Sequence, residues 1–242
     1  VGCDIYTVGR MAVRLQGGDR KSLIPANHFL ENSHIYDFAR ITLGGICGIR
    51  VDGVGNRIAH NLLHDGPTQG MGVGGNDQVV EFNEIHSVVL ESDDQSAIDS
   101  CKYLSYRGNV LRYNYVHHVG SGHPWGQAGS RMDGGVSGMV FYGNVFYKCS
   151  FGQFGAVHIN GGKDNWIDNN VFADCRYAIG FFISGPAKWK DRLSRPDTVR
   201  RLTRHVNVYE PPHSTTYPSL SRLREDPGVN HVWRNLVYDC GR

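Results

Sequence analysis

The chain of 242 residues contains no apolar stretch that approaches the roughly 20 residues of a membrane-spanning helix. Its formal net charge is only +2 and it has no basic run, so neither nucleic acid nor an anionic membrane surface is a predicted partner. It also begins at Val1, with no initial Met and no recognisable signal peptide in this segment. We therefore expect a processed or excised segment of a longer protein. Its six cysteines lack the C-x-x-C spacing of structural metal sites.

What the chain does contain is a repeat built around asparagine. The frame is an apolar residue, two residues, Asn, one residue and a second apolar residue, at intervals of 22 to 31 residues and a last interval of 65. The ladder positions are Ser33 in a degenerate first copy, then Asn61, Asn83, Asn114, Asn144, Asn170 and Asn235. Both apolar positions are apolar in all seven copies. One short strand and one fixed polar residue per unit predict a solenoid.

We predict an all-β fold, a parallel β-helix solenoid of about seven coils that forms a single domain over residues 1–242. The 31 glycines agree with turn-dense β structure. Stacked coils would lie about 4.8 Å apart, so each ladder Asn could hydrogen-bond to the next and has a structural role. Residues 186–228 break the repeat and are rich in Pro, Arg and Ser. We expect a long inserted loop there, acting as a lid, an oligomer contact or a plain surface loop.

Three cysteines share one column of this repeat. Cys149, Cys175 and Cys240 each follow a ladder Asn by five residues, and the same column elsewhere is mostly apolar. We therefore predict thiols that stack in the core, with disulfides between coils as the less favoured alternative.

A second strand precedes most turns, and alternation along it points every other residue outward. Aligning the coils places Asp99, Arg131 and His158 in one outward column, and Asp133 and Asn160 in the next. The flanking coils have mostly Gly in these columns. A polar cluster on a rigid sheet, with glycines leaving room beside it, is typical of a carbohydrate site. The alternative is a solvated face with incidental ion pairs.

An acidic loop, residues 90–96 (LESDDQS), leads into this cluster and includes Glu91, Asp93 and Asp94. Dense acid indicates catalysis, metal binding or a fully solvated loop. A carboxylate of this loop and Asp133 on the next coil could span the ~5 to 9.5 Å of glycosidase pairs, with one group as acid and the other as base or nucleophile. The candidate catalytic residues are thus Asp93, Asp94 and Asp133. The candidate substrate-binding residues are Asp99, Arg131, His158, Asn160, Trp125 and Glu91.

Two further features could contribute to ligand binding. Trp125, in a Gly-rich loop, could stack on a pyranose ring or merely anchor the loop. His64, His86 and His117 form an outward column three residues after the ladder, and stacked imidazoles suggest a metal. Tyr or Ala fills that column in other coils, so a surface-packing stripe is the favoured interpretation. We therefore predict no metal site and no cofactor, with Ca²⁺ as a minor alternative.

Several runs resemble bacterial right-handed parallel β-helix proteins of the pectate-lyase-like superfold, and above all glycoside hydrolase family 141, a group of α-L-fucosidases and xylanases. They are residues 55–67 (GNRIAHNLLHDGP), 74–77 (GGND), 81–86 (EFNEIH), 91–94 (ESDD) and 107–110 (RGNV). The resemblance covers about residues 10 to 185. It implies that the family's acidic pair matches Asp93 and Asp94. The family's Leu-Asp-Asp matches Met132-Asp133-Gly134, which keeps only the first Asp.

The resemblance implies a glycoside hydrolase that acts on plant or microbial polysaccharides or oligosaccharides, located outside the cell or in the periplasm. Two alternatives stay open. A polysaccharide lyase or epimerase would need a base and a group that neutralises a uronate, which His158 and Arg131 could supply. A non-catalytic glycan-binding or structural β-helix is favoured by the family's acidic positions that this chain lacks, which include the second Asp of Leu-Asp-Asp, here Gly134, and the Asp of Gly-Arg-Asp-Trp, here Tyr103.

Overall fold

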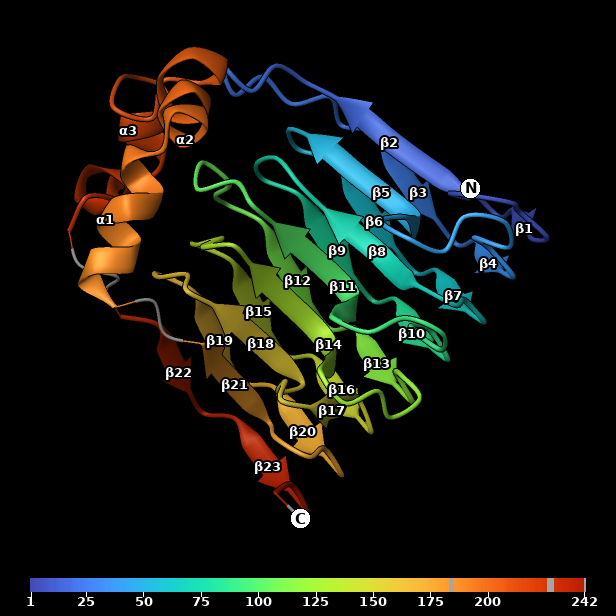
Figure 1. Cartoon of the computed structure of the whole chain (residues 1–242). Helices are drawn as coiled ribbons and strands as arrows, with labels where there is room; N and C mark the ends of the chain where they lie inside the picture. Colours follow the sequence, from blue (N-terminus) through green and yellow to red (C-terminus); the bar gives the residue numbers. More distant parts are fainter. Residues whose placement is uncertain (183–184, 226–228, 242) are drawn as a thin grey trace.

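The computed structural model describes residues 1–182, 185–225 and 229–241. In this part of the chain, short strands wind into three parallel sheets, and each coil contributes one strand to each sheet (Figure 1). The first sheet consists of β1 (Asp4–Ile5), β4 (His34–Tyr36), β7 (Leu62–His64), β10 (Glu84–His86), β13 (Tyr115–His117), β16 (Val145–Tyr147), β20 (Val171–Ala173) and β23 (Leu236–Tyr238).

The second sheet has the longest strands. It consists of β2 (Val13–Gly17), β5 (Cys47–Gly53), β8 (Gln69–Val73), β11 (Gln95–Cys101), β14 (Gly126–Asp133), β18 (Val157–Asn160) and β21 (Ile179–Phe182), with β17 (Ser150–Gly152) antiparallel to β14. The third sheet consists of β3 (Phe29–Glu31), β6 (Arg57–Ala59), β9 (Val79–Glu81), β12 (Val110–Arg112), β15 (Val140–Tyr142), β19 (Trp166–Asp168) and β22 (His231–Trp233). The predicted all-β parallel β-helix is confirmed. No helix in the described ranges is long and apolar enough to cross a membrane.

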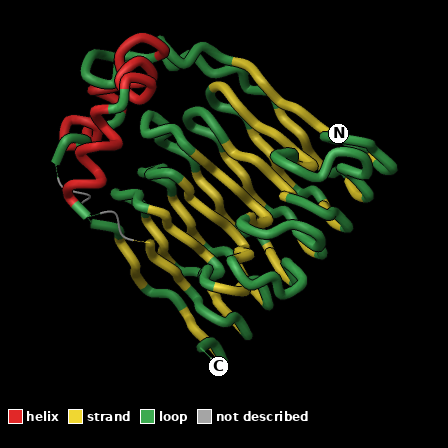
Figure 2. Tube along the Cα trace, viewed as in Figure 1, coloured by secondary structure: helices red, strands yellow, loops and turns green. Residues whose placement is uncertain are grey.

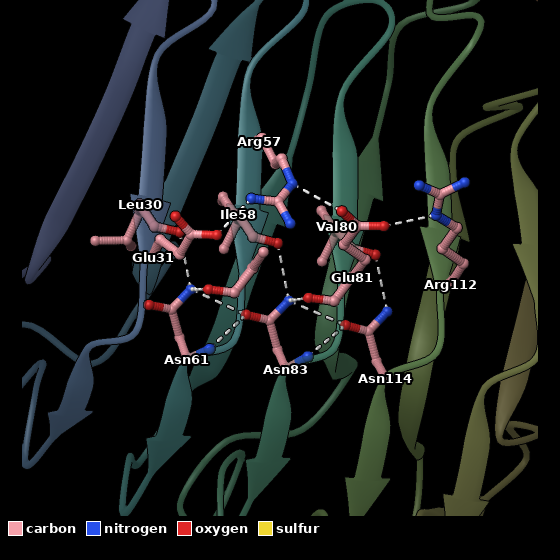
Figure 3. A network of polar contacts seen from close by, with 11 residues as sticks. Leu30, Glu31, Arg57, Ile58, Asn61, Val80, Glu81, Asn83, Arg112 and Asn114 are labelled. Atoms are coloured by element: carbon pink, nitrogen blue, oxygen red, sulfur yellow. Dashed lines mark hydrogen bonds and ion pairs between the residues drawn. The ribbon is translucent and has the colours of Figure 1, made fainter. Parts of the chain in front are cut away.

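The asparagine ladder lies at the corner between the third sheet and the first (Figure 3). The Oδ1 of Asn83 accepts hydrogen bonds from the backbone N–H of Asn61 at 3.1 Å and from its Nδ2 at 3.0 Å. The Nδ2 of Asn83 donates to the carbonyl oxygens of Glu81 and Ile58, both at 3.0 Å. The Oδ1 links recur from Asn61 through Asn235, so each amide satisfies the backbone of two coils.

The residue before each ladder position has a left-handed backbone, with φ between +47° and +64°. These residues are Asn32, His60, Phe82, Tyr113, Gly143, Asn169 and Arg234. Only one of them is Gly, and a side chain in this conformation costs about 1 kcal/mol or more. The ladder hydrogen bonds offset that cost, so residues other than Gly can take the left-handed conformation before each ladder position.

The two apolar columns form the core of the solenoid. Strand pairing aligns Leu30, Ile58, Val80, Leu111, Phe141, Ile167 and Val232 in one column, and Ile35, Leu63, Ile85, Val116, Phe146, Phe172 and Val237 in the other. All are buried except the two valines of the last coil. Cys149 and Cys175 are buried beside them with Sγ atoms 4.0 Å apart. Cys240, on the last coil, packs against the core but is only partly buried, so the core-stacking prediction is confirmed for two of its three cysteines. All six cysteines are free thiols.

The excursion after β21 contains short helices, which the sequence pattern did not predict. They are α1 (Pro186–Ser194), α2 (Pro196–Arg200), the π-helix η1 (Arg201–His205), α3 (His213–Thr216) and the 3-10 helix η2 (Pro218–Arg222). Residues 226–228 of the predicted insertion lie outside the described residues. The helices gather at one side of the coils (Figure 2) and bury a second apolar cluster around Trp189, Leu202 and Leu220.

Polar contacts tie the helical excursion to several coils. Tyr217 donates to Asp77 at 2.6 Å, and the Nζ of Lys163 donates to the Arg222 carbonyl at 2.8 Å. The Nε2 of His213 lies 2.6 Å from the Arg20 carbonyl on the first full coil. The excursion thus runs back along the solenoid, packed on its side.

We predict that Asn114→Ala lowers the free energy of unfolding by about 3 kcal/mol, because it removes the side-chain partner of the buried Asn83 backbone N–H and of the Val80 carbonyl oxygen. The exposed Asn207→Ala serves as control and should change the same free energy by less than about 0.5 kcal/mol. Urea unfolding curves measure both. Equal effects of the two substitutions would contradict a stabilising role of the ladder.

Candidate functional site

The second sheet brings the predicted outward residues together. Strand pairing places Asp99 beside Arg131, and Arg131 beside His158. On the neighbouring outward column, the Nδ2 of Asn160 donates to Oδ1 of Asp133 at 2.7 Å. These five residues, which we call the outward patch, come from β11, β14 and β18. Counting from the ladder therefore gave the correct register for all of them.

Arg131 is the centre of charge in the outward patch. Its Nε and Nη2 each lie 2.9 Å from Oδ2 of Asp99, and its Nη1 lies 2.5 Å from Oδ1 of Asp94. Burial alone would lower the pKa of Arg131, but Asp99, Asp133 and Asp94 outweigh it and raise the pKa above its usual value.

Much of the outward patch is covered rather than solvated. Asp99, Arg131 and His158 are 2%, 7% and 0% exposed, although they point out of the sheet. Burial raises the pKa of Asp99, against the opposing effect of Arg131. Its Oδ1 has no hydrogen-bond partner among the described residues. A buried carboxylate with one unpaired oxygen costs free energy, which is a common feature of functional sites.

Asp93 and Asp94 are adjacent in sequence but differ in their contacts. Asp93 accepts backbone hydrogen bonds from Gly126 at 2.9 Å, Trp125 at 3.1 Å and Asp94 at 2.9 Å. Burial would raise the pKa of Asp93, but these amides together lower it. Asp93 thus joins two loops, whereas the exposed Asp94 reaches Arg131. Among the two, Asp94 is the carboxylate that belongs to the outward patch.

The loop that carries Trp125 is held by a residue that sequence reasoning missed. The Oε1 of Gln127 accepts the backbone N–H groups of Ser121, Gly122 and His123, and its Nε2 donates to the carbonyl oxygens of Val89 and Ser92. Gln127 pairs with Gln95 on β11, and this polar column within a buried strand was the available signal. Trp125 itself is 53% exposed beside Asp93, and the side chain of Glu91 is also exposed.

His158 lies against aromatic rings. Its ring is stacked on Phe154 with centroids 4.1 Å apart and meets Phe182 edge-on at 4.5 Å. Both ring nitrogens are buried without a hydrogen-bond partner in the described part of the chain. Burial, reinforced by the charge of Arg131, lowers the pKa of His158 to about 4. His158 is therefore neutral at pH 7 and inaccessible to solvent.

The glycines beside the outward patch do not leave open space, which corrects our expectation. A Cβ on Gly72 would lie 2.9 Å from Nη1 of Arg50, and one on Gly180 would lie 2.6 Å from Nδ1 of His158. Neighbouring side chains fill the room. The helical excursion also reaches this region, because a Cβ on Gly135 would lie 2.5 Å from Nη1 of Arg192. Asp133 acts electrostatically on Arg192, and no sequence signal pointed to that arginine.

Comparison with protein families places the chain in a class. The family model described as right handed beta helix region matches residues 1–172 and so includes β11, β14 and β18. The chain therefore belongs to this family of right-handed parallel β-helices. Searches of curated proteins and of solved structures each found no match. Membership gives the fold, and activity has to be argued from the site.

The lowered pKa of His158 predicts a pH-dependent stability. Above about pH 6.5 the residue is neutral in both the folded and the unfolded state. As the pH falls from 6.5 to 4, the unfolded chain takes up a proton that the folded protein does not. The free energy of unfolding should therefore fall by up to about 3 kcal/mol from this residue alone.

His158→Phe should remove that part of the pH dependence, because a phenyl ring can pack on Phe154 and Phe182 but cannot titrate. Urea unfolding at a series of pH values measures it, with the exposed His60→Phe as control. If wild type and His158→Phe lost stability in parallel between pH 6.5 and 4, the buried neutral histidine would be disproved.

Proposed function

We propose that this protein is a glycoside hydrolase in which Asp94 and Asp133 form the carboxylate pair. The observation that carries the proposal is the arrangement around Arg131. Asp94 contacts its guanidinium directly from the acidic loop, and Asp133 acts on it from the same strand, two residues on. Both glycosidase mechanisms use a pair of carboxyl groups, one as acid and the other as base or nucleophile.

The contacts suggest different roles for the two carboxylates. Asp94 is 62% exposed in its side chain and ion-paired with Arg131, so we assign it as base or nucleophile. Asp133 is half-buried and its Oδ1 accepts a hydrogen bond from Asn160, so we assign it as the general acid. Asp99, on the strand of the preceding coil, would hold Arg131 in place through its ion pair. Asn160 would orient Asp133 through its hydrogen bond.

Sugar binding would fall to the loops around the outward patch. Trp125 presents an exposed ring on the loop that Asp93 and Gln127 fix, which suits stacking on a pyranose. Glu91 offers an exposed carboxylate that could accept from sugar hydroxyl groups. The resemblance to glycoside hydrolase family 141 supports a plant or microbial polysaccharide or oligosaccharide as substrate. Such substrates agree with a location outside the cell or in the periplasm.

A polysaccharide lyase or epimerase is the second candidate. It needs a base and a cation free to neutralise a uronate, and Arg131 and His158 are the residues that would serve. Arg131 already contacts two carboxylates, and His158 is buried and neutral. These contacts weigh toward hydrolysis. A glycan-binding protein without catalysis would use the same Trp125 surface.

We predict that Asp133→Asn and Asp94→Asn each lower hydrolysis at least about 100-fold, because each removes one member of the pair. The rate is measured by digesting a panel of plant and microbial glycans and quantifying the reducing ends released. Asp191→Asn on α1 is the matched control, since it removes an exposed, ion-paired aspartate far along the chain and should leave the rate unchanged.

Release of an unsaturated product that absorbs in the ultraviolet would show that the reaction is elimination and would reject hydrolysis. Turnover that survives both Asp94→Asn and Asp133→Asn would reject the assigned pair. Glycan binding without any turnover of the wild-type protein would reject an enzyme altogether.

A further inference from the structure

A row of imidazoles runs along the outer face of the first sheet, away from the outward patch. His34, His64, His86 and His117 come from β4, β7, β10 and β13. Ring centroids are 4.9 Å apart between His34 and His64, 4.8 Å between His64 and His86, and 4.7 Å between His86 and His117. The sequence favoured a packing stripe here, and ring stacking is indeed present. The structure adds a carboxylate.

Glu84 joins the last two imidazoles. It precedes His86 by two residues on β10, so both side chains leave the same face of the strand. One ligand atom of each of Glu84, His86 and His117 lies within 4.8 Å of the others. The closest approach is 3.1 Å, between Oε1 of Glu84 and Nε2 of His117. Two imidazoles and one carboxylate are the ligand set of many zinc sites that keep an open position.

Neighbouring residues hold the other ring nitrogens. The Nδ1 of His117 lies 2.8 Å from Nδ1 of His118, and the Nδ1 of His86 lies 3.0 Å from Oγ of Ser87. When Nδ1 of His117 donates to His118, its Nε2 lone pair faces the Glu84 carboxylate, and a cation would bring these two acceptors together. Partners of this kind orient metal-binding histidines in known sites.

We propose that Glu84, His86 and His117 form a binding site for a divalent transition-metal ion of the Zn²⁺ type. A tetrahedral ion with bonds of about 2.0 to 2.1 Å requires ligand atoms about 3.4 Å apart. Glu84 and His117 already meet that spacing. His86 would close the remaining distance by rotating its ring out of the stack between His64 and His117. Solvent or a substrate group would fill the fourth position.

The site would link two coils that lead to the outward patch. The chain runs from β10 into the acidic loop and from β13 into the loop that carries Trp125. A bound ion would cross-link β10 and β13 just before both loops. The proposal does not depend on the glycosidase assignment, because it rests on different residues and on binding alone.

The test is titration of metal-free protein with ZnCl₂ by calorimetry, and with CoCl₂ by visible absorption. We expect one ion per chain and the intense visible bands of four-coordinate Co²⁺. His117→Ala and His86→Ala should each weaken binding at least about 100-fold, beyond the loss typical of an outer partner. Glu84→Gln, at an exposed position, should weaken it with little effect on folding. The control is His60→Ala, an exposed histidine at the corner between the third and first sheets, outside the proposed ligand set.

Three results would overturn the site. They are less than one bound Zn²⁺ per chain, binding that Glu84→Gln and His117→Ala leave unchanged, or a weak Co²⁺ spectrum typical of six oxygen ligands. Circular dichroism of each variant, compared with wild type, separates lost ligands from lost fold. Loss of glycan hydrolysis has no bearing on this outcome, because binding is measured without substrate.

Discussion

The structure depends on one repeated hydrogen bond, in which the side-chain oxygen of a ladder asparagine accepts from the backbone and the side chain of the asparagine one coil earlier. Because each amide must meet the next, the coils cannot slide along one another without leaving buried polar groups unpaired. The same amides allow non-glycine residues to turn the corner with positive φ. The register of all three sheets follows from this corner, since each coil contributes one strand to each sheet.

Fixed register turns a linear sequence into columns, and the columns explain the outward patch. Asp99, Arg131 and His158 are far apart in sequence but adjacent on β11, β14 and β18. Their burial has a cost, because charged groups lose water. Arg131 limits that cost by ion pairs with Asp99 and Asp94. A charged centre on a rigid strand can hold the Asp94 and Asp133 carboxylates in a defined arrangement without a conformational change.

Periodic features were predictable from the sequence, and lateral packing was not. The ladder, both apolar columns, the cysteine column and the alignment of the outward patch all follow from counting residues. The helices of the excursion, the approach of Arg192 and the stacking of Phe154 on His158 depend on chain segments outside the repeat, which counting cannot place. The contact between Glu84 and His117 was not predicted, because it joins two different outward columns of the first sheet and the histidine column alone does not include Glu84.

The most direct test of the account is a double-mutant cycle on the ladder. Asn83 and Asn114 contact each other, whereas Asn61 and Asn144 are three coils apart, or about 14 Å. Unfolding free energies of Asn83→Ala, Asn114→Ala and the double variant should show a coupling of about 1 kcal/mol or more, while the distant pair should be additive within about 0.5 kcal/mol. Additivity of the adjacent pair would contradict the claim that ladder contacts set the register.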